Sequence, residues 1–138
     1  MLIKFLNCLR KTLTPSVADV FIYYSAKECG IYLYGWLNAN YEPKNVDELL
    51  SYLQRFMKEM KLGLLNICAF NPEDGKIVLR VERGFEVETG VGGETCVFMR
   101  GMLEGLIEQI IVRNITLEET ACASAGSPYC EFSATIKR

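Results

Sequence analysis

The chain has 138 residues, half of them hydrophobic, and a formal net charge of −2. This length fits one domain with its own core, so we take residues 1–138 as a single domain. A near-neutral charge without a basic run argues against nucleic acid as the main partner, because phosphate binding needs clustered Lys and Arg. Histidine is absent, which removes the usual catalytic triads and the zinc-protease motif. A non-catalytic protein is therefore favoured over an enzyme.

The N-terminal sequence does not have the pattern of a signal peptide. Lys4 and Asn7 interrupt its apolar run, and no small-residue cleavage site follows. No apolar stretch reaches the ~18 residues that indicate a membrane span. We expect a cytoplasmic protein, in which thiols stay reduced and clustered cysteines bind metal or react.

Residues 1–13 form a possible short N-terminal helix. Thr14 and Pro15 then begin a long helix, since a hydroxyl N-cap followed by Pro is a typical start. Its apolar residues recur at helical spacing to about Leu37: Val17, Val20, Phe21, Tyr24 and Ile31. The aromatic residues of this segment are expected in the core, or else lining a pocket or a dimer surface: Tyr23, Tyr24, Tyr32, Tyr34 and Trp36.

Asn45 followed by Glu48 predicts the start of the next helix, and Gly63 follows its end. The pattern then changes to strands. Leu64 to Phe70 is apolar, N-P-E-D-G is a turn, and three apolar residues alternate with charged ones in a second strand: Ile77, Leu79 and Val81. Phe85 and Val87 are expected to continue that strand past Gly84.

G-V-G-G at 90–93 is interpreted as a turn, since it lacks the G-K-[ST] of a phosphate loop. A third helix is predicted from about Thr95 to Val112, with a solvated charged stripe formed by Arg100, Glu104 and Glu108. Gly101 and Gly105 lie one turn apart on this helix and permit close approach of a backbone or a ligand. Two strands follow, at about 114–121 and 130–136.

This order of elements predicts an α+β domain, α(α)ββαββ. Adjacent strands with short turns form hairpins, so we expect an antiparallel four-stranded sheet with the helices packed on one face.

Four potential metal ligands occur in the C-terminal third. Because alternate side chains of a strand share a face, Glu119 and Cys130 are both predicted to point inward on neighbouring strands. Cys122 has the opposite parity to Glu119 but lies where its strand ends, and Cys96 stands at the start of the third helix. Zinc takes four such ligands tetrahedrally, and a filled shell indicates a structural site.

Two alternatives to a metal site remain on spacing alone. Free cysteines often fill space in a core, and Cys122 and Cys130 are also placed for a cross-hairpin disulfide. Cys8, Cys29 and Cys68 have no ligand-like surroundings and are predicted to be core thiols.

The stretches C-V-F-M-R-G-M-L-E-G-L-I-E and E-T-A-C-A-S-A-G-S-P-Y-C-E-F resemble the 4-vinyl reductase domain family. This family has archaeal stand-alone members and is related to the sensor domain of aromatic-responsive activators and to vesicle-tethering complex subunits. The resemblance implies a homodimer that pairs through its helices. It also implies zinc at Cys96, Glu119, Cys122 and Cys130, beside a pocket for a small aromatic effector. The sensors hold a phenolic hydroxyl with His and Trp; this chain has no His, so phenol recognition of that kind is not expected.

A pocket beside the third helix is predicted to be lined by Phe98 and Met102, next to Gly101 and Gly105, with Trp36 as a further candidate. Buried Met and Phe without charge favour an apolar ligand. The leading hypothesis is a non-catalytic module that binds a small apolar or aromatic molecule and carries a structural zinc. The alternatives are a dimeric protein–protein scaffold without ligand, and an enzyme that uses the thiols or a recruited cofactor.

Overall fold

A computed structural model describes residues 2–88 and 96–136. The G-V-G-G segment at 90–93 lies outside the described residues. In chain order the elements are α1 (Leu2–Thr12), α2 (Pro15–Tyr41), α3 (Val46–Glu59), β1 (Leu64–Asn71), η1 (Pro72–Asp74), β2 (Lys76–Glu82), α4 (Phe85–Glu88), α5 (Val97–Ile111), β3 (Ile115–Ala121), η2 (Ala123–Ala125) and β4 (Cys130–Ile136).

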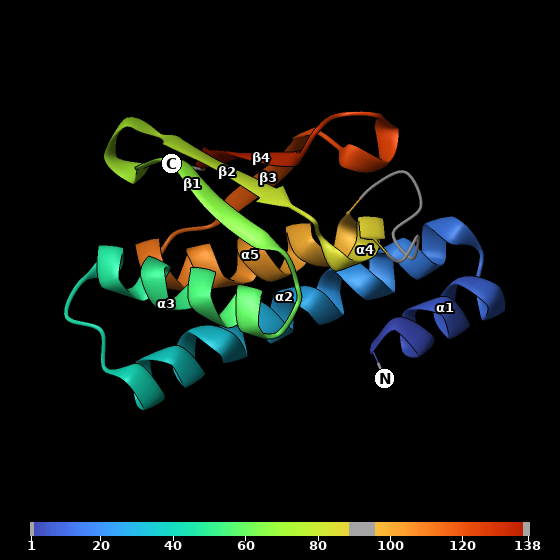
Figure 1. Ribbon diagram of the computed structural model, residues 1–138, viewed down its shortest axis with the longest axis horizontal. Coiled ribbons are helices and arrows are strands. Elements are labelled where there is room, and N and C mark those ends of the chain that lie inside the picture. Colours follow the sequence, from blue (N-terminus) through green and yellow to red (C-terminus); the bar gives the residue numbers. More distant parts are fainter. Residues whose placement is uncertain (1, 89–95, 137–138) are drawn as a thin grey trace.

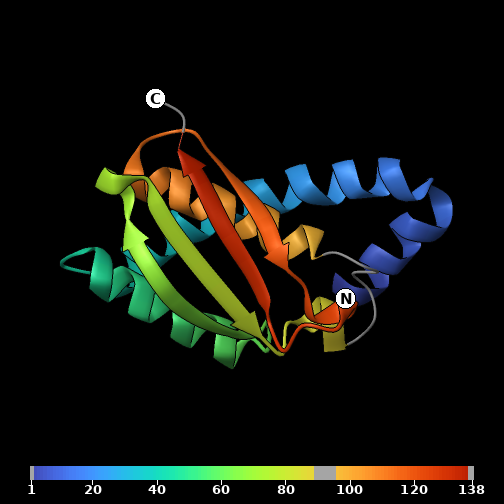
Figure 2. The same ribbon diagram turned by 90° about the horizontal axis from the view of Figure 1, so that it is seen from above.

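The four strands form one antiparallel sheet in the order β1-β2-β4-β3. The long helices lie beneath one face of it (Figure 1), and the opposite face is uncovered when the molecule is viewed from above (Figure 2). This architecture confirms the predicted α+β class, the order of elements and the placement of the helices. The alternating burial of β2 is also as predicted, with Ile77, Leu79 and Val81 inside.

Helix α3 begins and packs as the sequence predicts. The Asn45 side chain accepts a hydrogen bond from the Glu48 N–H at 2.8 Å, which satisfies one of the free donors of the first turn. Its buried residues are Leu49, Leu50, Leu53 and Met57. The apolar stripe thus points at the sheet, as amphipathic helices do in two-layer folds.

Helix α2 begins at Pro15 as predicted, but most of the apolar residues that predicted it lie outside the core. Val17, Val20, Phe21 and Tyr24 are all exposed, Tyr24 to 62%. The buried face instead consists of Ala18, Ile22, Ala26, Gly30, Leu33 and Leu37. Small residues dominate this face because α2 packs at very short range against α5.

The contact between α2 and α5 depends on glycine. A Cβ atom added to Gly30 would lie 2.0 Å from the Met102 carbonyl oxygen, and one added to Gly105 would lie 2.2 Å from the Lys27 carbonyl oxygen. Gly101 meets the Tyr23 carbonyl oxygen in the same way, at 2.5 Å. The close approach predicted at Gly101 and Gly105 is therefore made by the backbone of α2.

The prediction that Phe85 and Val87 extend the second strand is wrong, because these residues form the short helix α4. Arg83 adopts a left-handed conformation (φ 51°) that turns the chain out of β2. The N–H groups of Val87 and Glu88 then donate to the Gly84 carbonyl. The turn places Phe85 and Glu86 inside the protein.

The predicted solvated stripe on the third helix is also wrong, since Glu104 is only 1% exposed. It accepts hydrogen bonds from the Tyr23 hydroxyl, from Lys27 Nζ at 3.2 Å and from the Leu117 N–H at 2.9 Å. These partners belong to α2 and β3, so one carboxylate links two helices and the sheet. A buried charge is tolerated because its oxygens are paired in this way.

The predicted core thiols Cys8, Cys29 and Cys68 are exposed. Cys68 lies at an irregularity of β1, where the pairing with β2 shifts between Ile67 and Ala69. Within the described part of the chain, no helix combines the length and apolarity needed to cross a membrane.

Candidate metal centre and apolar cavity

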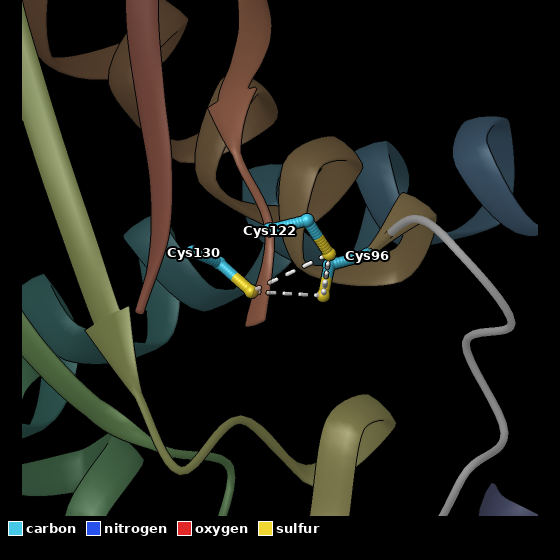
Figure 3. Close-up of side chains that lie close together, drawn as sticks. All are labelled: Cys96, Cys122 and Cys130. Carbon is cyan, nitrogen blue, oxygen red and sulfur yellow. Dashed lines mark hydrogen bonds between the residues drawn. The ribbon is translucent and has the colours of Figure 1, made fainter. Parts of the chain in front are cut away.

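Three of the four predicted ligands meet in a compact, buried cluster (Figure 3). The Sγ atoms of Cys96 and Cys130 are 3.3 Å apart, those of Cys122 and Cys130 3.8 Å, and those of Cys96 and Cys122 3.9 Å. Tetrahedral zinc with Zn–S bonds of ~2.3 Å requires sulfur atoms ~3.8 Å apart. The three thiols therefore fit one soft divalent cation with little adjustment.

The fold brings these cysteines from three separate elements. Cys96 is the N-cap of α5, Cys122 follows β3, and Cys130 begins β4. An irregularity in the β3–β4 pairing explains how Cys122 faces inward despite its parity: Glu119 pairs with Phe132, and Ala121 with Glu131. The extra residue, Thr120, reverses the alternation beyond it, as a β-bulge does.

Glu119 lies beside the thiols and is half-buried on the inward side of β3. Its Oε2 accepts a hydrogen bond from the Cys96 N–H at 3.0 Å. The carboxylate also hydrogen-bonds the Cys122 thiol, which, after burial, raises the pKa of Cys122 to about 11. Glu119 is thus within reach of two cysteines of the cluster, whereas Glu118 is exposed.

The cluster favours a shared negative charge. A hydrogen bond from the Cys96 thiol lowers the pKa of Cys130 to about 6, with a further contribution from the Ala123 N–H, although burial opposes the shift. That same bond, together with burial, raises the pKa of Cys96 above its usual range. The protein therefore offers one thiolate near neutral pH, held by its neighbours, and a cation would take the remaining protons' places.

A second carboxylate close to the cluster was not predicted from the sequence. Glu86 is buried, and its two oxygens accept the N–H groups of Phe98 at 3.0 Å and of Met99 at 2.8 Å, at the start of α5. Burial raises the pKa of Glu86 to about 7, while these two backbone bonds lower it. Nothing in F-E-V-E marks this role, because it depends on the turn after β2.

An apolar cavity of about 340 Å³ lies between the helices. Three of the predicted ligand-contacting residues line it: Trp36 of α2, and Phe98 and Met102 of α5. The other lining residues are Leu2, Cys29, Tyr32, Leu33, Phe56 and Leu62. Volumes of this order are typical of small-molecule sites.

Gly101 and Gly105 lie against α2, so the structure brings them beside Met102 on α5 without placing them on the cavity wall. Met102 follows Gly101 directly, and its carbonyl oxygen meets Gly30. The glycines therefore fix the distance between the two helices that carry most of the cavity lining.

Comparison with known proteins gives the identity of this arrangement. Residues 77–136, from β2 to β4, match the family model of the vinyl-4-reductase domain. The resemblance to the 4-vinyl reductase family is confirmed. This segment contains all three clustered cysteines and Glu119.

Two relatives come from Methanocaldococcus jannaschii, and both are uncharacterized. MJ1642 is 29% identical over 137 residues, which cover 98% of this chain and 74% of the relative. MJ0150 is 28% identical over 91 residues, covering 66% of this chain. The chain spans about half the length of MJ0150.

Solved structures share the fold. The phenol-responsive sensory domain of the activator PoxR, solved with phenol, aligns over 98% of this chain and 72% of its own length with a TM-score of 0.79 and 15% identity. A vinyl-4-reductase family protein from M. jannaschii aligns over 85% and 68% (TM-score 0.61, 24% identity). A trafficking protein particle complex subunit 3 from Naegleria fowleri, covalently bound to palmitic acid, aligns over 98% and 90% (TM-score 0.67, 9% identity).

Proposed function

We propose that this protein is a non-catalytic module that binds a small apolar or aromatic molecule in the cavity lined by Trp36, Phe98 and Met102. The observation that carries the proposal is the cavity itself, which has about 340 Å³ of space and an almost wholly apolar wall. Burial of ligand surface against such a wall supplies binding free energy without a specific polar partner. Two relatives in fold hold compounds of this kind, phenol in one and palmitic acid in the other.

A structural zinc is the second part of the proposal, with Cys96, Cys122 and Cys130 as ligands and Glu119 as the fourth. The spacing of the thiols supports it. The ion would tie the start of α5 to the β3–β4 hairpin. Since α5 also carries Phe98 and Met102, the zinc would hold one wall of the cavity in place.

The fourth ligand is tested by a matched pair of variants on one strand. Glu119→Gln is expected to weaken zinc retention against a chelator, because an amide oxygen is a poorer ligand than a carboxylate, whereas Glu118→Gln should not. Competition with a colorimetric chelator measures both. The reverse order of effects would exclude Glu119 as a ligand.

We further propose that the module is a cytoplasmic single domain that forms a homodimer. The exposed apolar face of α2, defined by Val17, Val20, Phe21 and Tyr24, supports a protein contact, since apolar side chains at helical spacing on a surface mark interaction sites. The same face supports the second candidate function, a scaffold that binds protein and no ligand.

The chain's single tryptophan provides a direct test of ligand binding, because Trp36 lines the cavity. Titration with 1-decanol, a neutral apolar probe, is expected to change Trp36 fluorescence in a saturable manner. Cys29→Phe should abolish the change by filling the cavity, while Cys68→Phe, at another exposed cysteine, should not. A fluorescence response that Cys29→Phe leaves intact would contradict the proposed site, and no response in the wild type would favour the scaffold.

A further inference from the structure

A second cavity, of about 490 Å³, has a cationic rim. Lys58, Lys61 and Arg83 all line it, together with one acidic residue, Glu88. None of these three cations forms an ion pair within residues 2–88 and 96–136. The floor is apolar, since Leu64 and the buried Phe85 contribute to it. Unpaired positive charge above an apolar floor is suited to an anion attached to an apolar body.

This cationic cavity adjoins the apolar one. Leu62 lines the apolar cavity, while its neighbours Lys61 and Gly63 line the cationic one. Between the two, the rings of Phe85 and Phe98 meet edge to face with centroids 5.4 Å apart, one ring from each lining. The two spaces are therefore separated only by side chains. Figure 1 shows the elements involved, where the α3–β1 turn, the end of β2 and α4 come together above the start of α1.

The backbone around the cationic cavity is held in unusual conformations. Lys61 (φ 57°) and Arg83 (φ 51°) are both left-handed, and Gly63 has φ 148°. A Cβ atom at Gly63 would lie 2.7 Å from Val81 Cγ1. Non-glycine residues rarely adopt left-handed conformations, and such residues gather where the surrounding structure fixes a functional geometry. Here two of them are cations on the same rim.

We infer that the ligand of this protein is an amphipathic anion, with its apolar body in the cavity of Trp36 and its anionic head at Lys58, Lys61 and Arg83. This inference rests on the proposed function and specifies its ligand class. The cations are exposed, so the head would keep part of its hydration, and the long Lys and Arg side chains can close around it. A carboxylate and a phosphate share the chemistry required.

Two probes of equal chain length separate the contribution of the head from that of the body. Trp36 fluorescence is titrated with decanoate and with 1-decanol, both below their micelle concentrations, at low and at high salt. Exposed ion pairs contribute modestly, so three of them are expected to give decanoate about tenfold tighter binding. Salt should reduce this preference, because it screens exposed charges. Decyl phosphate in place of decanoate shows which head the rim prefers.

Variants then locate the head. The triple variant Lys58→Gln, Lys61→Gln, Arg83→Gln should remove the preference for decanoate and leave 1-decanol binding unchanged. Lys76→Gln is the control, because Lys76 lies at the opposite end of β2 from Arg83. Circular dichroism verifies that the triple variant is folded, and its unchanged affinity for 1-decanol reports the same.

Each outcome decides a separate point. Equal affinity of the wild type for acid and alcohol overturns the anionic head and leaves the apolar site standing. A preference that survives the triple variant, or that Lys76→Gln removes equally, overturns the assignment to this cavity. Binding of neither probe overturns the proposed function and the inference with it.

Discussion

Replacing Glu104 by Gln tests whether a single buried carboxylate holds α2, α5 and β3 together. Its Oε2 accepts the Leu117 N–H at 2.9 Å, and its Oε1 accepts Lys27 Nζ at 3.2 Å and the Tyr23 hydroxyl. Arg100 lies over the Tyr23 ring, 4.4 Å from its centroid, which adds a further contact to the same network.

The magnitude follows from what Gln can still accept. Its amide oxygen can take the Leu117 N–H, but its NH₂ group then faces Lys27, which has only donors. Losing one hydrogen bond to a charged group costs about 1.5–3 kcal/mol. The cost should stay below the ~3–5 kcal/mol of a fully broken buried pair, because Lys27 retains Glu108 at 3.1 Å.

Urea unfolding followed by circular dichroism measures this loss. Glu118→Gln is the matched control, since Glu118 is exposed on β3 and its substitution should stay within about 0.5 kcal/mol. A Glu104→Gln variant as stable as this control would refute the claim that the charge of Glu104 supports the fold.

Three further perturbations have defined outcomes. Gly105→Ala should destabilise the protein by about 1–3 kcal/mol, because its Cβ would overlap the Lys27 carbonyl, whereas Gly35→Ala, which meets nothing within 4 Å, should stabilise it by about 0.5–1 kcal/mol. Cys130→Ser, or verified removal of zinc, should lower the melting temperature by about 10 °C; an unchanged melting curve would exclude a structural metal. Burial, followed by the hydrogen bond to Glu104, raises the pKa of Tyr23 from 10.0 to about 12, so the stability it contributes is complete below pH 10 and falls as the pH rises towards 12. Tyr23→Phe should remove this part of the pH dependence, and parallel stability curves would contradict it.

Local rules predicted the elements well and their surroundings less well. The start of α3 at Asn45 and the alternation in β2 depend on nearby residues, so both were predictable. The inward position of Cys122 depends on an extra residue at Thr120, and strand parity alone cannot show a bulge. Cys122 could be associated with Glu119 and Cys130 only because it stands at the end of its strand.

The errors on α2 and α5 have one cause. The core face of α2 uses Ala and Gly so that the helices can approach, and such residues give a weak hydrophobic signal, whereas Val20 and Tyr24 give a strong one and are exposed. The charge spacing of Glu104 is typical of a solvated helix. Its burial becomes visible only once Tyr23 and Lys27, about 80 residues earlier in the chain, are placed against it.

A crystal structure of the protein with a brominated decanol tests the central claim most directly, because bromine is located by its anomalous scattering. The account predicts a single bromine peak in the cavity lined by Trp36, Phe98 and Met102. Bromine found on the exposed face of α2, or at no fixed position in protein shown to be folded, would contradict the proposal that this cavity is the ligand site.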